Sequence, residues 1–227
     1  MKREDILKAI SDSGLPPRLK DYLKVLVRTG TGSELRRDLK ADAAGLLDSI
    51  STLLHSASAA LDAPCDEILC TTGFDYNNFS GDRLEAALAE LRAVSILADM
   101  GFTGIRLLPG GRSREADISA GLSGKKFAFE VRCVKRASGP SKDLDDRVES
   151  LRAVYEKKVR QARVSRRREN SERIGVFIVS APARAVPMTG GGELSSLAAR
   201  VYEELGRPAE EHVCLAAGAS AAVFPPF

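Results

Sequence analysis

The segment 125–136, KKFAFEVRCVKR, constrains the fold of this chain most strongly. Every second side chain in its middle is apolar: Phe127, Phe129, Val131 and Cys133. This alternation predicts a β-strand with one buried face. The opposite face carries Glu130 and Arg132, a carboxylate and a guanidinium in mid-strand. Such a pair is either a surface ion pair or part of a functional site.

The residues before this strand predict a hairpin. A Ser-Gly dipeptide at 123–124 separates two strand-like runs, which is typical of a tight two-residue turn. Pairing the strands about that turn places Asp117 opposite Glu130, and Glu115 opposite Arg132. Directly opposed residues have Cβ atoms ~5 Å apart, so two facing carboxylates repel each other. The pair Asp117 and Glu130 therefore requires a cation or a proton.

A third carboxylate lies on the helix predicted for residues 80–101. The positions three and four residues from Glu90 hold only apolar side chains: Ala86, Ala87, Ala93 and Val94. A carboxylate on an apolar helix face is costly without a partner, although Glu90 alone also fits a helix edge with its head in solvent. Glu85, close to Asp82, is expected to be exposed. Oxygen-only clusters of two or three carboxylates suit Mg²⁺ or Mn²⁺.

The order of elements predicts an α/β fold. Residues 79–227 predict a mixed central sheet flanked by helices on both faces, with an α-β-β-β-α-β core. Residues 1–78 predict an N-terminal all-helical subdomain. One long helix is expected from residue 33 to 61, with an apolar stripe of Leu35, Leu39, Leu46, Ile50 and Leu53. This stripe packs either on its own domain or on a second copy, as a homodimer, and a protein that dimerises in this way could serve as an assembly factor.

Three short motifs resemble the PD-(D/E)xK nuclease superfamily, in its restriction-endonuclease-like and Holliday-junction-resolvase-like branches. They are Glu90 three helical turns before Gly101-Phe102, the E-x-D context of Glu115-Ala116-Asp117, and FEVR at 129–132. The resemblance covers roughly residues 80–180. It implies a metal-dependent endonuclease that hydrolyses phosphodiester bonds in DNA. It also implies Mg²⁺ or Mn²⁺ as the cofactor, with the following metal ligands: Asp117, Glu130, the Val131 carbonyl and Glu90.

The chain departs from this superfamily at one position, where Arg132 replaces the motif lysine. Arginine stays protonated and cannot act as a base, but it can stabilise charge on a phosphoryl centre. The site is therefore either active with Arg132 in an electrostatic role, or a degenerate module that binds nucleic acid or a protein. Arg132 also fits a simple pair with Glu115. The auxiliary candidates are Glu115, Lys135, Lys157, Lys158 and Gln161.

Charge is distributed unevenly along the 227 residues. The chain carries a net charge of +3, yet residues 151–173 alone hold nine Lys or Arg against three Glu. Such a basic stretch indicates either a polyanion partner, here DNA, or a solvated helix face. The candidate phosphate contacts are Arg163, Arg166, Arg167 and Arg168.

The remaining features concern location. No apolar run approaches the ~20 residues that span a bilayer, which predicts no membrane partner. The charged N-terminus has no apolar segment after it, so a cytoplasmic protein is expected. The four cysteines have no CxxC spacing, so reduced thiols are expected rather than zinc ligands or disulfides.

Overall fold

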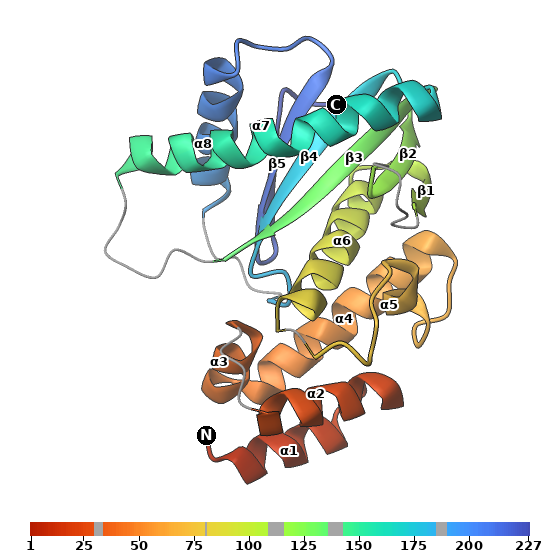
Figure 1. The fold of residues 1–227 in the computed structure, drawn as a ribbon, viewed down its shortest axis with the longest axis vertical. Coiled ribbons are helices and arrows are strands. Elements are labelled where there is room, and N and C mark those ends of the chain that lie inside the picture. Colours follow the sequence, from red (N-terminus) through yellow and green to blue (C-terminus); the bar gives the residue numbers. More distant parts are fainter. Residues whose placement is uncertain (30–33, 80, 109–115, 136–142, 185–189) are drawn as a thin grey trace.

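The computed structural model describes residues 1–29, 34–79, 81–108, 116–135, 143–184 and 190–227. The described residues form eight helices and six strands (Figure 1). The helices are α1 (Arg3–Asp12), α2 (Pro17–Thr29), α3 (Glu34–Ala41), α4 (Ala43–Leu61), α5 (Ile68–Thr71), α6 (Gly81–Asp99), α7 (Leu144–Glu169) and α8 (Gly191–Glu204). The strands are β1 (Thr103–Leu107), β2 (Ile118–Leu122), β3 (Lys125–Val134), β4 (Arg173–Ser180), β5 (Glu211–Ala217) and β6 (Ser220–Phe224).

The six strands form one mixed sheet in the order β1-β2-β3-β4-β5-β6. Strands β1, β2 and β3 form an antiparallel meander, and β3, β4 and β5 run parallel. Strand β6 returns antiparallel to β5. Since α6 precedes the meander and α7 connects β3 to β4, the predicted α/β class and α-β-β-β-α-β core are confirmed.

A two-residue turn sets the register of the β2–β3 hairpin. Ser123 and Gly124 have φ angles of 50° and 77°. Positive φ at both central residues is the geometry of a type I′ turn, which matches the twist of the strands it joins. Leu122 therefore pairs with Lys125, and Ile118 pairs with Phe129. This is the register predicted from the sequence.

Helices cover both faces of the sheet. The α6 face of β3 carries Phe127 and Phe129, which pack with Phe102 and Phe227 in edge-on contacts. Helices α7 and α8 cover the opposite face and enclose a second apolar core, to which Ala128 belongs (Figure 1). Burial on both faces explains why β3 and β4 are rich in large apolar side chains.

The long N-terminal helix expected for residues 33–61 is two helices. Asp42 ends the first and caps the second, because its Oδ1 accepts a hydrogen bond from the Gly45 N–H at 3.0 Å. An Asp in this cap position has the extended backbone that breaks a continuous helix. The predicted apolar stripe is nevertheless buried, with its first two leucines on α3 and the rest on α4.

That stripe is covered by the chain itself. Leu39 and Ile50 have no exposed surface, and one apolar core extends from α1–α4 onto α6 and one face of the sheet. The homodimer predicted through this stripe is therefore not supported. The division into domains at residue 78 stays a prediction. No helix in the described part of the chain is both long and apolar enough to cross a bilayer.

Candidate active site

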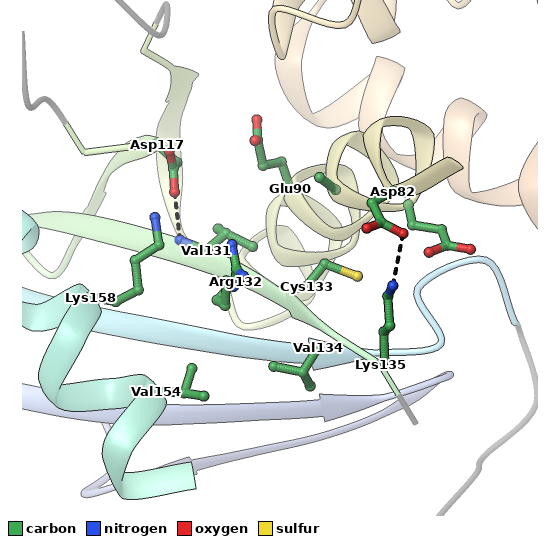
Figure 2. Close-up of a pocket in the computed structure, with 12 residues that line it drawn as sticks. Asp82, Glu90, Asp117, Val131, Arg132, Cys133, Val134, Lys135, Val154 and Lys158 are labelled. Atoms are coloured by element: carbon green, nitrogen blue, oxygen red, sulfur yellow. Dashed lines mark hydrogen bonds and ion pairs between the residues drawn. The ribbon is translucent and has the colours of Figure 1, made fainter. Parts of the chain in front are cut away.

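A cavity of about 600 Å³ opens where the second half of β3 continues past Ile118, the first residue of β2 (Figure 2). Helix α6 forms one wall, α7 forms another, and the second half of β3 forms the floor. The charged residues that line the cavity are Asp82, Glu85, Glu90, Asp117, Arg132, Lys135 and Lys158. Because the site lies at an edge, helices from opposite faces of the sheet both reach it.

Asp117 ends the pairing of β2 with β3. Its N–H donates to the Phe129 carbonyl at 3.0 Å, and its Oδ2 accepts from the Val131 N–H at 2.7 Å. The carboxylate thus replaces the next backbone acceptor of the ladder. The N–H and C=O of a strand residue point to the same edge, so the Val131 carbonyl also faces this side.

Glu130 lies opposite Asp117 on the α7 face and has no exposed surface. Lys158 of α7 donates from Nζ to its Oε2 at 2.8 Å. The other oxygen, Oε1, is buried and has no hydrogen-bond partner among the residues that the structure describes. A buried carboxylate oxygen without a partner is costly, so Glu130 has capacity for another cation or proton.

Burial disfavours negative charge at all three carboxylates, and the charge of Asp117 adds to this effect at Glu130 and Glu90. Burial, then the charge of Asp117, raises the pKa of Glu130 to about 7, against the opposing Lys158. Burial, then the charge of Asp117, raises the pKa of Glu90 to about 8. Burial also raises the pKa of Asp117, although the Val131 N–H acts in the opposite direction. The cluster therefore attracts protons or cations near neutral pH.

The other predicted site residues lie at different places. Arg132 is exposed where it lines the cavity, and Lys135 pairs with Asp82 at 3.3 Å on the surface. Lys157 and Gln161 are not among the described lining residues. Of the three candidates on α7, the structure thus places only Lys158 at the carboxylates. Glu115 lies outside the described residues.

Two of the four predicted phosphate contacts are neutralised by acidic neighbours. Arg163 donates from Nε to Glu211 Oε1 at 2.6 Å, and Arg166 forms an ion pair with Glu210. Arg167 and Arg168 are exposed near the end of the helix. The basic character of α7 is thus partly compensated by residues at the start of β5.

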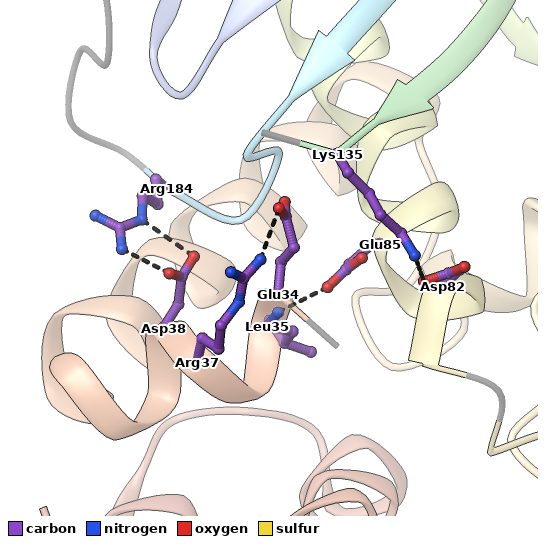
Figure 3. Close-up of polar contacts among 8 residues, drawn as sticks. All are labelled: Glu34, Leu35, Arg37, Asp38, Asp82, Glu85, Lys135 and Arg184. Atoms are coloured by element: carbon purple, nitrogen blue, oxygen red, sulfur yellow. Dashed lines mark hydrogen bonds and ion pairs between the residues drawn. The ribbon is translucent and has the colours of Figure 1, made fainter. Parts of the chain in front are cut away.

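Glu85 is buried, contrary to the expectation that it is exposed. Its side chain accepts the Leu35 N–H at 2.7 Å and so satisfies a backbone donor at the first turn of α3 (Figure 3). Burial raises its pKa, in spite of this hydrogen bond. Leu88 and Ala89, three and four residues further along α6, are apolar and buried. These neighbours were the sequence signal that could have indicated burial of Glu85.

A second polar contact joins α3 to the loop after β4. Arg184 donates from Nε and one terminal nitrogen to the two oxygens of Asp38, at 3.1 and 2.7 Å (Figure 3). A two-point contact of this kind fixes orientation as well as distance. Together with Glu85, it anchors the first half of the chain beside the cavity.

The donor set of the cavity fits a hard divalent cation. The described residues contain no group of three His, Cys, Asp or Glu side chains so arranged that together they could hold a metal ion. Asp117 and Glu130 are instead a carboxylate pair with one unpartnered buried oxygen and a backbone carbonyl at the same edge. Mg²⁺ commonly uses one or two carboxylates and keeps several waters, so a pair is sufficient.

Comparisons with known proteins yield one structural similarity. No family model matches the chain, and no curated protein matches it. Among solved structures, the restriction endonuclease FokI bound to DNA is similar, with a TM-score of 0.32 and 15% sequence identity. The match covers 85% of this chain but only 29% of the FokI chain.

Proposed function

We propose that this protein is a metal-dependent endonuclease that hydrolyses phosphodiester bonds in DNA. The observation that carries the proposal is the opposition of Asp117, which lines the cavity, and the buried Glu130 behind it, with Lys158 of the cavity wall bound to Glu130 at 2.8 Å. Two facing carboxylates repel each other and destabilise a sheet. Proteins accept such a cost mainly at functional sites. The motifs that resemble the PD-(D/E)xK superfamily supply the class of reaction.

In this proposal Asp117 and Glu130 hold Mg²⁺ or Mn²⁺, and the Val131 carbonyl is a further oxygen donor. A bound metal would supply positive charge for the phosphate and a water of lowered pKa. Asp117 is held in place by the Val131 N–H, which fixes its carboxylate relative to the strand. Glu90 adds negative charge from the opposite wall of the cavity.

Lys158 takes the role that the superfamily gives to the strand lysine. Its side chain is 20% exposed, so its ammonium group reaches both Glu130 and the open cavity. An ammonium group with three donors can position the attacking water while one donor stays on Glu130. Arg132, exposed beside the cavity, supplies charge for the developing phosphorane without acting as a base.

The test is cleavage of supercoiled, linear and branched DNA in Mg²⁺ or Mn²⁺. We expect cleavage by the natural protein, and a loss of roughly 100-fold or more in Asp117→Asn and in Lys158→Met. The matched control is Lys157→Met, which removes an exposed lysine from the same helix and should leave the rate unchanged. Absence of cleavage on all three substrates with both metals would reject the proposal.

A second candidate is a degenerate nuclease-fold module that binds nucleic acid or a protein without turnover. The observation in its favour is the same ion pair, because Lys158 already neutralises Glu130 while Arg132 stands at the motif lysine position. Metal binding separates the two candidates. A nuclease requires Mn²⁺ binding that is lost in Asp117→Asn, whereas the module requires salt-sensitive DNA binding that Asp117→Asn leaves intact.

A further inference from the structure

A second, smaller cavity of about 210 Å³ lies on the meander, beside the C-terminal end of α7. We call it the hairpin groove and define it by Arg106, Ser119, Gly121, Lys126 and Glu169, all of which line it. Figure 1 shows the end of α7 beside the β2–β3 hairpin. The backbone hydrogen bond from Glu172 to Lys126 holds the two together at 2.9 Å.

The hairpin groove lies on the same face of the sheet, the α7 face, as Asp117 and Glu130. Asp117, Ser119 and Gly121 alternate along the chain, so their side-chain positions point to the same side. Gly121 pairs with Lys126, and Arg106 pairs with Ser119, which brings both cations onto this face. At ~3.3 Å per residue, Ser119 and Gly121 lie about 7 and 13 Å from Asp117 along β2.

The hairpin groove contains a hydrogen-bonding group without a partner. Ser119 is 7% exposed, and its Oγ has no hydrogen-bond partner in the part of the chain that the structure describes. Buried hydroxyl groups are nearly always satisfied, so an unsatisfied one next to a cavity points to an external acceptor. A phosphate oxygen is an acceptor of this kind.

The charges of the hairpin groove favour an anion. Arg106 and Lys126 are exposed, and neither makes a hydrogen bond or ion pair with another described residue through its side chain. This distinguishes them from Arg163 and Arg166, which are paired with glutamates. Glu169 opposes the two cations, which leaves one net positive charge among these three groups.

Gly121 leaves the floor of the hairpin groove open. A Cβ built there would meet its nearest neighbour, the Thr103 carbonyl oxygen, at 3.6 Å, an ordinary contact. The backbone therefore tolerates a methyl group at this position, and packing does not require glycine. An added methyl would narrow the hairpin groove without disturbing the strand, which makes Gly121→Ala a steric test.

We propose that the hairpin groove binds a backbone phosphate of the same DNA strand whose scissile phosphate lies at Asp117 and Glu130. This inference rests on the proposed function, since it takes the carboxylate pair as the point of cleavage. A separation of ~7–13 Å along β2 is short enough for both contacts to fall on neighbouring phosphates of one strand. Arg106, Lys126 and the Ser119 hydroxyl are the phosphate contacts.

Salt dependence of DNA binding by the full chain tests the two cations. Affinity for a labelled duplex is measured without divalent metal, so that cleavage plays no part. Each phosphate contact contributes ~0.9 to the slope of log affinity against log salt, so Arg106→Gln and Lys126→Gln should each lower that slope by about 0.9. Lys8→Gln, an exposed charge on α1, is the matched control and should leave it unchanged.

Ser119→Ala and Gly121→Ala test the hydrogen bond and the shape. We expect Ser119→Ala to lower affinity roughly two- to tenfold with no change of slope, because it removes a donor and no charge. The same substitution should not lower the melting temperature, since the hydroxyl has no partner to lose among the described residues. A serine with only a structural role would show a lower melting temperature and an unchanged affinity when replaced by alanine. Gly121→Ala should weaken binding while the fold persists.

The outcomes separate this proposal from the nuclease proposal. Unchanged slopes in both Arg106→Gln and Lys126→Gln, or no DNA binding by the natural protein, would overturn the hairpin groove as a phosphate site. Displacement of DNA by inorganic phosphate at matched ionic strength that is equally effective in the natural protein, Arg106→Gln and Lys126→Gln would also overturn it, because the hairpin groove would then be an adventitious ion site only. Reduced slopes without any cleavage would support the hairpin groove as a phosphate site and reject the nuclease proposal. Cleavage with an unchanged KM in both variants would support the nuclease proposal and reject the hairpin groove.

Discussion

Replacing Glu90 with glutamine should stabilise the protein at high pH and have little effect at low pH. Burial, together with the charges of Asp117 and Glu130, raises the pKa of Glu90 from 4.5 to about 8, while Lys158 lowers it. The folded state therefore holds this proton more tightly than the unfolded state. The stability contributed by protonated Glu90 is fully present below about pH 4.5 and is lost as the pH rises through about 8.

The size of the effect follows from that shift. A difference of one pKa unit corresponds to about 1.4 kcal/mol. With pKa values of 4.5 and about 8, the loss amounts to about 1 kcal/mol near pH 5 and about 5 kcal/mol near pH 9. Glu90→Gln removes this pH-dependent loss. The difference in unfolding free energy between the variant and the natural protein should therefore grow by about 4 kcal/mol from about pH 5 to about pH 9, or roughly 8–16 °C in melting temperature.

The assay is urea unfolding of both proteins near pH 5 and near pH 9, in a chelator so that no metal competes with the proton. Glu149→Gln, which alters an exposed glutamate on α7, serves as the matched control and should show no such growth. An advantage of Glu90→Gln that is equal at both pH values would refute the reasoning. It would mean that the carboxylate is solvated in the folded protein.

Three further predictions concern packing, an ion pair and metal. Gly175→Ala places a Cβ 2.6 Å from the ring of Phe129, so unfolding in urea should show a loss of about 1–3 kcal/mol, whereas Gly190→Ala, with open space around it, should be tolerated. Arg184→Gln breaks the two-point contact with Asp38 and should cost about 1–3 kcal/mol in unfolding free energy, and the same substitution should cost less in an Asp38→Asn background. Mg²⁺ at about 100 times its dissociation constant should stabilise the natural protein by about 2.7 kcal/mol, measured as a rise in melting temperature that a chelator reverses.

Local features of the sequence were sufficient for the fold class and for one pair of site residues. The alternation in β3 predicted which side chains face α6, because a strand has a period of two. The Ser123-Gly124 turn predicted the register, because a type I′ turn joins adjacent strands without an offset. Opposition of Asp117 and Glu130 follows directly from those two observations. Neither depends on residues far away in the chain.

Helix neighbours were harder to predict because they depend on distant segments. The sequence left Lys157, Lys158 and Gln161 as candidates, and only the packing of α7 against the sheet selects Lys158. The partner of Glu85 is the Leu35 backbone, 50 residues earlier in the chain. No local pattern reports such a contact, so Glu85 was predicted to be exposed.

The sequence by itself determined the strand alternation, the hairpin register, the order of elements and the facing carboxylates, because turn geometry and side-chain periodicity act over a few residues. Only the tertiary structure decided which cations meet those carboxylates and which remain available for a ligand. It pairs Arg163 with Glu211, which lies 48 residues further along the chain, and leaves Arg106 and Lys126 exposed on the meander. The physical reason is that a charge is neutralised by whatever packing brings within hydrogen-bond distance.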